Sequence, residues 1–174
     1  MEKIEFILNE FNKCDIKLST EQAERFNKLY EFLVEYNKNV NLTAITDFKE
    51  IVVKHFIDSV LPFNMIDIEE NSSFIDVGTG AGFPSIPLMI VRPDLKCTML
   101  EALNKRCVFL EKACELVGVK ATVVHGRAED YAKDRRECFD FATARAVANM
   151  SVLSEYCMPY VKVGGKFIAL KSVN

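Results

Sequence analysis

The sequence predicts an α/β protein with a Rossmann-like sheet, helices on both faces, and a helical extension at its N-terminus. Two observations favour this fold. From residue 73 onward, short apolar segments alternate with amphipathic helices, a pattern typical of a mostly parallel sheet. A glycine-rich loop follows the first of these segments, and ligands of such sheets bind at the carboxyl ends of the strands.

Length and composition agree with a folded domain. The chain has 174 residues, of which 49% are hydrophobic and 27% charged, as in one globular domain with its own core. No apolar stretch reaches the ~18 residues that a membrane helix needs, and the start Met1-Glu2-Lys3 lacks the pattern of a signal peptide. We therefore expect a cytoplasmic protein with no membrane partner.

Cysteines and net charge exclude two further classes of site. Six scattered cysteines form no C-x-x-C pair, and the chain has only two histidines, so no metal site is predicted and most cysteines are expected in the core. The net charge of −3 and the pI near 5.5 are not typical of a general nucleic-acid binder. Any contact with nucleic acid would have to be local.

The first sixty residues predict three helices. Apolar residues recur at helical spacing in the first, at Ile4, Ile7, Leu8 and Phe11. Ser19 and Gln22 form a capping box at the start of the second. Asp47 and Glu50 mark the start of the third, which is expected to stop at Pro62.

The remainder predicts five strands with helices between them. Strands are expected near 73–77, 96–100, 121–124, 139–143 and 166–171, and helices near 85–91, 104–117 and 149–160. Gly118 fits the stop of the middle helix. The chain thus divides into a helical extension at residues 1–65 and a sheet domain at residues 66–174.

The loop after the first strand favours S-adenosylmethionine as the ligand. Its spacing is G-x-G-x-G, from Asp76 through Gly78 and Gly80 to Gly82. The dinucleotide fingerprint needs glycine where Phe83 stands, and the G-K-[ST] of a phosphate-binding loop is absent, so a phosphate cradle and an NAD-dependent oxidoreductase are disfavoured. S-adenosylmethionine carries no phosphate, and it needs glycines for close approach and acids for its polar groups.

Acidic residues follow the next two strands. Glu101 ends the second strand, where its two oxygens can accept hydrogen bonds from both ribose hydroxyls. Glu129 and Asp130 follow the third strand, within reach of an adenine edge. A lone G-x-G-x-G is also typical of a turn that binds no ligand. A pair such as Glu129-Asp130 is also typical of a solvent-exposed helix start. The loop and the two acids in this order are much more specific.

Polar and basic residues indicate a substrate side. His55 and Asp58 lie three apart on the third helix and can point into one pocket, although a structural hydrogen bond is the alternative interpretation. Cations follow the strands at Lys105-Arg106, Arg127, Arg145 and Lys171. A local cationic rim of this kind can hold RNA phosphates on an acidic chain, because charges act over a Debye length of about 8 Å.

Five motifs carry a resemblance to a known family. They are Asn41-Leu42-Thr43-Ala44, Lys54-His55-Phe56-Ile57-Asp58-Ser59, the segment from Asp76 to Pro84, Lys105-Arg106, and Arg145-Ala146-Val147-Ala148. Together they resemble the RsmG family, also called GidB, which methylates guanine N7 in bacterial 16S ribosomal RNA. The resemblance spans nearly the whole chain. It implies a class I S-adenosylmethionine-dependent methyltransferase whose partner is 16S ribosomal RNA or the small ribosomal subunit.

The resemblance also implies residue roles. Donor contacts are implied for Gly78, Phe83, Ala128, Glu129 and Arg145, with Glu101 at the ribose, beside Asp76, Gly80 and Gly82 of the loop. Catalytic roles are implied for Arg145, Lys171, His55 and Asp58, and RNA contacts for Lys54, Arg106 and Arg127. Ser85 and Ser172 stand where the family has glycine. Guanine N7 has a free lone pair and no proton, so positioning is expected to supply most of the catalysis.

The chain is shorter than the resemblance implies. Family members continue past the fifth strand with a helix and an antiparallel pair, so the domain is expected to lack the usual last two strands and to expose a sheet edge. One alternative is a non-catalytic remnant that folds and binds donor or RNA weakly. Another is a methyltransferase with a small-molecule or protein substrate, although no Asn-Pro-Pro-Tyr motif is present.

Overall fold

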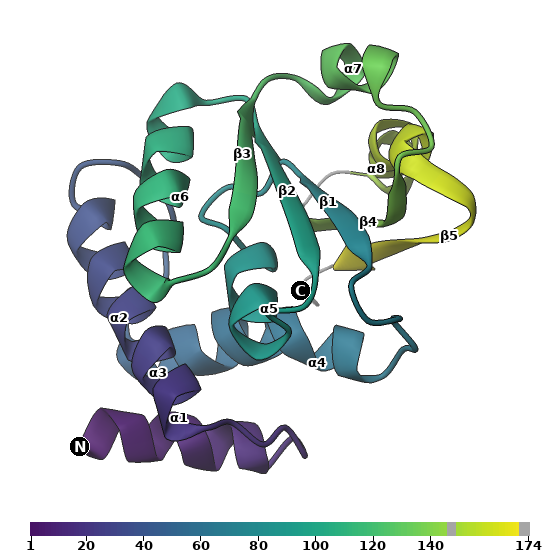
Figure 1. Ribbon diagram of the computed structural model, residues 1–174. Helices are drawn as coiled ribbons and strands as arrows, with labels where there is room; N and C mark the ends of the chain where they lie inside the picture. Colours follow the sequence, from purple (N-terminus) through teal and green to yellow (C-terminus); the bar gives the residue numbers. More distant parts are fainter. Residues whose placement is uncertain (146–148, 171–174) are drawn as a thin grey trace.

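A computed structural model of the chain describes residues 1–145 and 149–170 and shows a five-stranded parallel sheet (Figure 1). The strands are β1 (Ser73–Val77), β2 (Lys96–Glu101), β3 (Ala121–His125), β4 (Phe139–Arg145) and β5 (Val161–Leu170). Their order is β3-β2-β1-β4-β5, with every neighbouring pair parallel. The chain reverses its direction across the sheet between β1 and β4, and such switch points are where open α/β sheets bind ligands.

Helices cover both faces, which confirms the predicted fold. The N-terminal helices are α1 (Glu2–Asn12), α2 (Thr20–Asn37), α3 (Phe48–Ile51), the π-helical turn η1 (Val52–Ile57) and α4 (Asp58–Asn64). The later helices are α5 (Ser85–Val91), α6 (Asn104–Val117), α7 (Ala128–Tyr131), η2 (Ala132–Asp134), α8 (Met150–Cys157) and η3 (Met158–Tyr160). In Figure 1 the N-terminal helices, α5 and α6 lie on one side of the sheet, and α7 and α8 on the other.

Predicted ends were wrong at two elements. The third helix continues through Pro62 to Asn64, because proline removes a bond to the preceding turn but leaves the residues after it free to stay helical. The fifth strand begins at Val161 rather than near residue 166. Its first residue, Val161, pairs with Phe139, and the register between β4 and β5 shifts after this pair. The exposed Gly164-Gly165 pair interrupts the apolar pattern that predicts a strand.

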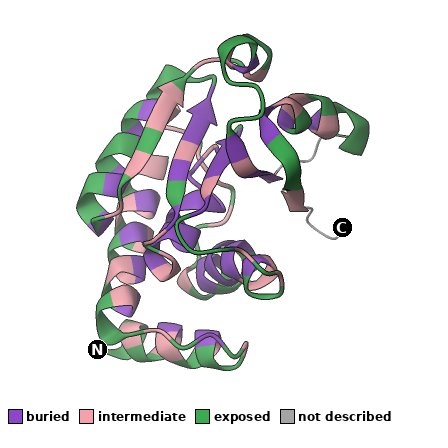
Figure 2. Cartoon of the chain, turned by 45° about the vertical axis from the view of Figure 1, so that its right-hand side comes forward, coloured by how far each residue is buried: buried purple, intermediate pink, exposed green. Residues whose placement is uncertain are grey.

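Alternate strand residues feed two hydrophobic clusters, one on each face. Phe74, Met99 and Phe141 belong to the larger cluster with the N-terminal helices, α5 and α6, whereas Ile75 and Leu100 belong to the smaller cluster under α8. Figure 2 shows this buried interior between exposed outer helices. The predicted N-terminal helices thus share one core with the sheet. As expected, most cysteines are buried: Cys97, Cys107, Cys114 and Cys157.

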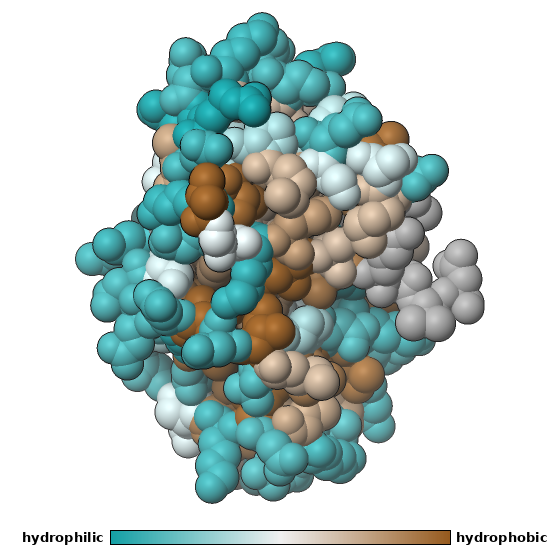
Figure 3. Space-filling view, turned by 90° about the vertical axis from the view of Figure 1, so that its right-hand side faces the viewer, coloured by the Kyte–Doolittle hydropathy of each residue, from teal (hydrophilic) through white to brown (hydrophobic). Residues whose placement is uncertain are grey.

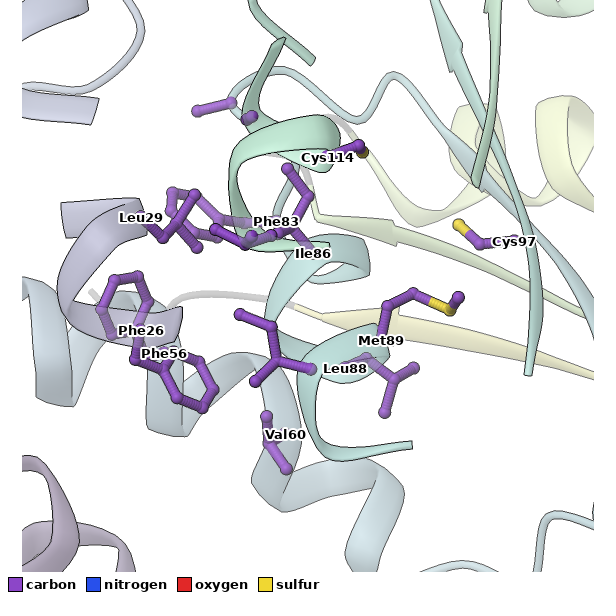
Figure 4. Packing of buried hydrophobic residues seen from close by; sticks show 14 of the residues in the cluster. Phe26, Leu29, Phe56, Val60, Phe83, Ile86, Leu88, Met89, Cys97 and Cys114 are labelled. Atoms are coloured by element: carbon purple, nitrogen blue, oxygen red, sulfur yellow. The ribbon is translucent and has the colours of Figure 1, made fainter. Parts of the chain in front are cut away.

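The second helix is fixed to the sheet domain at its first turn. Ser19 and Gln22 form the predicted capping box, and the Gln22 side-chain amide also donates a 2.9 Å hydrogen bond to the carbonyl of Ile90 in α5. Farther along, Phe26 and Leu29 of α2 pack toward Phe56 and Phe83 (Figure 4). These contacts hold the N-terminal helices beside the loop that follows β1.

Among the described residues, β5 is an edge strand that pairs with β4 alone. The face of the molecule that carries β5 shows apolar surface gathered at its centre (Figure 3). Partly buried Phe167, Ile168 and Leu170 belong to β5 and pack on the two clusters. No helix within residues 1–145 and 149–170 has the length and apolarity to cross a membrane.

We expect Gly82→Ala to destabilise the protein more than Gly118→Ala. Both glycines have positive φ, +82° and +68°, which costs a residue with Cβ about 1–2 kcal/mol. A Cβ at Gly82 would lie 2.5 Å from Ile86 Cδ1 and 3.1 Å from Leu110 Cδ2, whereas at Gly118 it would meet nothing within 4 Å. Overpacking adds about 1–3 kcal/mol at Gly82 only. Urea denaturation of both variants measures this difference, and equal losses would contradict it.

Candidate functional site

The glycine loop between β1 and α5 is held against the end of β2. The backbone N–H groups of Gly78 and Thr79 both donate to the carbonyl of Leu100, at 2.8 and 3.2 Å. Gly78 and Gly80 adopt positive φ, +71° and +60°. A Cβ on Gly78 would meet nothing within 4 Å, and one on Gly80 would meet its nearest atoms at 4.0 Å. This part of the loop therefore presents backbone to open space that a ligand can occupy.

Asp76 lies beneath the loop and is fully buried. Its Oδ2 accepts hydrogen bonds from the hydroxyls of Thr79 and Ser85, at 2.6 and 2.7 Å, while Oδ1 has no partner among the described residues. Burial raises the pKa of this carboxyl to about 7. Predicted as a donor-binding residue, Asp76 here supports the loop from below. Ser85 supplies one of the two hydroxyls.

Glu101 lies beside the loop at the end of β2. Its Oε2 accepts from the N–H of Gly80 and its Oε1 from the N–H of Leu103, both at 2.9 Å. Each oxygen keeps a further lone pair for a ligand hydroxyl. Arg106, predicted to contact RNA, reaches toward this carboxylate with Nη1 at 4.0 Å from Oε2 and donates from Nη2 to the carbonyl of Asn41. The structure thus places Arg106 against the glycine loop.

A pocket of about 320 Å³ opens at the carboxyl ends of β1, β2 and β3. This volume is in the range of small-molecule sites, roughly 300–1,000 Å³. Its walls include Gly78, Ala102, Ala128, Glu129, Leu153 and Tyr156. A larger cavity of about 750 Å³ lies at the opposite edge of the sheet, beside the first residues of β2 and β3, and contains none of the predicted site residues.

Leu153 and Tyr156 are pocket residues that the sequence analysis missed. Both lie on α8, after the fourth strand, where an ordinary amphipathic pattern gives no sign of a ligand. The negative charge of Glu129 nearby raises the pKa of the Tyr156 hydroxyl. The pocket therefore combines apolar walls with one acidic side chain, as a purine ring with an exocyclic amino group requires.

Arg145, at the end of β4, joins the sheet to η1. Its Nη2 donates to the carbonyl of Lys54 at 2.7 Å and to Nδ1 of His55 at 2.8 Å, and its Nη1 donates to Ser59 Oγ at 3.4 Å. The guanidinium lies 5.7 Å from the centre of the Phe83 ring, on which His55 stacks at 4.8 Å. Predicted from separate motifs, Arg145 and His55 are in direct contact.

The contacts of His55 determine its protonation. Arginine only donates, so Nδ1 of His55 accepts and its proton lies on Nε2, which is 2.8 Å from Thr43 Oγ1. Burial, followed by the charge of Arg145, lowers the pKa of His55 from 6.5 to about 4. His55 is therefore neutral at pH 7.

This lowered pKa predicts a pH-dependent stability. As the pH falls, His55 becomes protonated in the unfolded chain before it does in the folded protein. The neutral imidazole therefore contributes fully to the free energy of unfolding above pH 6.5, and this contribution is lost as the pH falls toward 4. Relative to His55→Gln, the protein should lose about 2 kcal/mol of unfolding free energy between pH 7 and pH 5. Asp76, whose pKa is raised, has the opposite dependence, with stability lost as the pH rises toward 7.

Chemical denaturation at several pH values measures the effect. Because Asp76 is present in both proteins, its contribution cancels in the difference between wild type and His55→Gln. His125→Gln, at an exposed position, controls for removal of a histidine elsewhere. A difference that does not change between pH 7 and pH 5 would contradict a neutral, buried His55.

The other predicted residues are distributed around these two groups. Lys54 and Asp58 are exposed beside His55, and Lys54 pairs with Glu50 at 2.5 Å. Arg127 is exposed after β3 and lines the pocket. Phe83 is 6% exposed, so its ring belongs to the core beneath the site. Lys171, together with the segment 146–148 of the last motif, lies outside the described residues.

Comparison with known proteins gives a consistent result. Residues 22–174 match the GidB family, described as "rRNA small subunit methyltransferase G". The chain is 56% identical over 159 residues to "Ribosomal RNA small subunit methyltransferase G" of Clostridium beijerinckii, covering 90% of this chain and 66% of that protein. A relative of the same name from Staphylococcus haemolyticus is 49% identical over 174 residues, covering 99% and 72%. The chain thus spans about two thirds of the length of these relatives.

Solved structures share the fold at low sequence identity. A putative S-adenosyl-L-methionine-dependent methyltransferase from Methanococcus maripaludis has a TM-score of 0.58 and 16% identity, covering 82% of this chain and 62% of that one. TYW2 from M. jannaschii, solved in complex with AdoMet, has a TM-score of 0.54 and 13% identity, covering 68% and 51%. At 13–16% identity, these similarities show a shared fold alone.

Proposed function

Because the chain belongs to the rRNA small subunit methyltransferase G family, we propose that it transfers a methyl group from S-adenosylmethionine to N7 of a guanine in 16S ribosomal RNA. The observation that carries the proposal is the position of two groups at one edge of the sheet. The glycine loop and its pocket follow β1, β2 and β3, and the Arg145–His55 pair follows β4. The proposed location is the cytoplasm and the proposed partner the small ribosomal subunit.

The residues at the pocket fit S-adenosylmethionine. Gly78 and Gly80 leave room for close approach of a ligand, Glu101 retains acceptor capacity beside them, and Ala128 and Glu129 line the pocket farther along. We assign the ribose to Glu101 and the adenine to the wall that contains Leu153 and Tyr156. When bound, the donor supplies a methyl group activated by its sulfonium charge.

The guanine side is assigned to the cluster at η1 and β4. Guanine N7 needs no base to remove a proton, so the chain has to hold the nucleotide in line with the methyl group, an effect worth roughly 7–11 kcal/mol in favourable cases. Arg145 has a fixed orientation suited to this task, and His55 is uncharged. Lys54 and Asp58 are exposed polar groups beside His55, and Arg127 is an exposed cation at the pocket that follows β3. The helical extension at residues 1–65 thereby adds to the substrate face of the methyltransferase domain at residues 66–174.

Two measurements test the proposal. Calorimetric titration with S-adenosylmethionine and its demethylated product should show saturable binding near one molecule per chain. Small ribosomal subunits that lack the methyl group should then gain one in the presence of donor and protein. A folded sample that binds neither donor nor product would overturn the donor site. Donor binding with transfer only to a small molecule or a protein would overturn the RNA substrate.

A further inference from the structure

The segment after α2 is a loop held by side-chain hydrogen bonds, and the proposed function gives it no role. The side chain of Asn37 holds it at three points. Its Oδ1 accepts from the N–H groups of Leu42 and Thr43, at 2.8 and 3.1 Å, and its Nδ2 donates to the Thr43 carbonyl at 2.9 Å. The Thr43 hydroxyl also accepts from the N–H of Ile45 at 3.1 Å. The position of Thr43 Oγ1 is therefore fixed from both sides.

Thr43 Oγ1 lies at one end of a chain of polar contacts that reaches the proposed methylation site. It is 2.8 Å from Nε2 of His55, and Nδ1 of the same ring is 2.8 Å from Nη2 of Arg145. Thr43 and His55 belong to the N-terminal region, and Arg145 belongs to β4. The hydroxyl of Thr43 is thus connected to Arg145 through a single residue, His55, although the two are far apart in the sequence.

The other tautomer of His55 also has a partner in the structure. The Lys54 carbonyl oxygen is 3.2 Å from Nδ1, so a proton on Nδ1 could be donated to it. That carbonyl already accepts from Arg145 at 2.7 Å. In the second tautomer His55 would compete with Arg145 for Lys54 and would place an N–H against a guanidinium N–H. The tautomer of His55 therefore determines whether Arg145 keeps both acceptors.

We propose that Thr43 is a positioning residue. Its hydroxyl oxygen accepts a hydrogen bond from the Nε2–H of His55, and the unprotonated Nδ1 therefore accepts a hydrogen bond from Arg145. The role in transfer rests on the proposed function, whereas the tautomer does not. Removing the hydroxyl leaves a buried Nε2–H without an acceptor, which destabilises this tautomer. This penalty favours moving the proton to Nδ1, where Lys54 accepts it, and Arg145 then loses a contact that orients it.

The test compares Thr43→Val with Thr43→Ser. Valine has nearly the shape of threonine but no hydroxyl, and serine retains the hydroxyl. The ¹⁵N chemical shifts of the two histidine rings report the tautomers directly. His125 is an internal reference for a proton on Nε2, because that atom lies 3.0 Å from the carbonyl of Ala102. Donor affinity and methyl transfer to undermethylated small subunits are measured on the same proteins.

For Thr43→Val we expect the His55 signals to shift toward the Nδ1–H tautomer. Methyl transfer should fall by about 10-fold to 100-fold, the scale of a small misplacement, with unchanged donor affinity. Thr43→Ser should retain the Nε2–H tautomer and most of the transfer. An Nε2–H tautomer in Thr43→Val, or a tautomer change with full transfer, would overturn the proposal.

The measurements separate this proposal from the proposed function. If wild type transfers no methyl group to RNA, the proposed function fails, and the ring signals of Thr43→Val still decide whether Thr43 selects the tautomer. If wild type transfers and Thr43→Val loses donor affinity and transfer in equal measure, the hydroxyl acts on the donor site and its positioning of Arg145 is excluded.

Discussion

Replacement of Arg145 by alanine is expected to reduce methyl transfer by about 100-fold or more while changing donor affinity less than about threefold. The guanidinium is half-buried and donates to Lys54, His55 and Ser59, all outside the pocket that follows β1, β2 and β3. Its removal therefore alters the guanine side of the proposed site and leaves the donor side in place. Transfer under saturating donor, together with calorimetric donor binding, measures the two effects.

Two control variants sharpen this prediction. Arg145→Lys keeps the charge but lacks the planar fork that serves three acceptors at once, so most of the loss should remain. Arg136→Ala removes an exposed cation in the turn before β4 and should leave transfer unchanged. Equal losses of donor affinity and transfer in Arg145→Ala would assign the arginine to the donor instead. Thermal unfolding checks that each variant is folded.

The fold could be predicted from the sequence because its signals are local and agree with one another. The capping box at Ser19, the Asp47 cap and the stop at Gly118 are present as expected. Prediction failed where tertiary pairing outweighs local pattern. Val161 is a strand residue because it pairs with Phe139 on β4, which is a long-range contact. The exposed Gly164-Gly165 pair interrupts the strand pattern of the sequence after Val161, so the pattern does not predict this start.

The candidate site was predicted in part. Because Glu101 ends the strand that follows the glycine loop in the sequence, it was predicted to lie beside the loop. In the structure its carboxylate accepts a hydrogen bond from the N–H of Gly80. Spacing alone does not show which side of a turn faces the solvent. Asp76 and Phe83, predicted to contact the donor, lie beneath the loop, and the missing Cβ of Gly82 is explained by packing against Ile86. Burial is a property of the whole fold and cannot be derived from a motif of nine residues.

The polar contacts around His55 could be found only in three dimensions. Thr43 and Arg145 contact His55 from separate parts of the chain, and Asn37 holds the backbone of Thr43. The sequence places His55 and Asp58 three apart on a helix, which suggested one shared pocket. In the structure His55 is buried and contacts Arg145 of β4, whereas Asp58 is exposed and acts on Arg145 through its charge.

Gly78→Val is expected to weaken donor binding by about 100-fold or more. The glycine lines the pocket, and a side chain there would project into space that no protein atom fills within 4 Å. We place the donor in that space, so a branched side chain would overlap it. Overpacking of about 1–3 kcal/mol corresponds to as much as roughly 100-fold in affinity, and loss of contacts between donor and backbone adds to it.

Gly118→Val is the matched control, because it reproduces the backbone strain without touching the pocket. Its φ of +68° is close to the +71° of Gly78, and its Cβ also meets nothing within 4 Å. Gly118 follows α6 and lies at the opposite edge of the sheet, ahead of β3. The two variants should lose similar stability, while only Gly78→Val loses donor affinity. Unchanged affinity in Gly78→Val would refute the donor site at this loop, and equal loss in both variants would attribute the effect to misfolding.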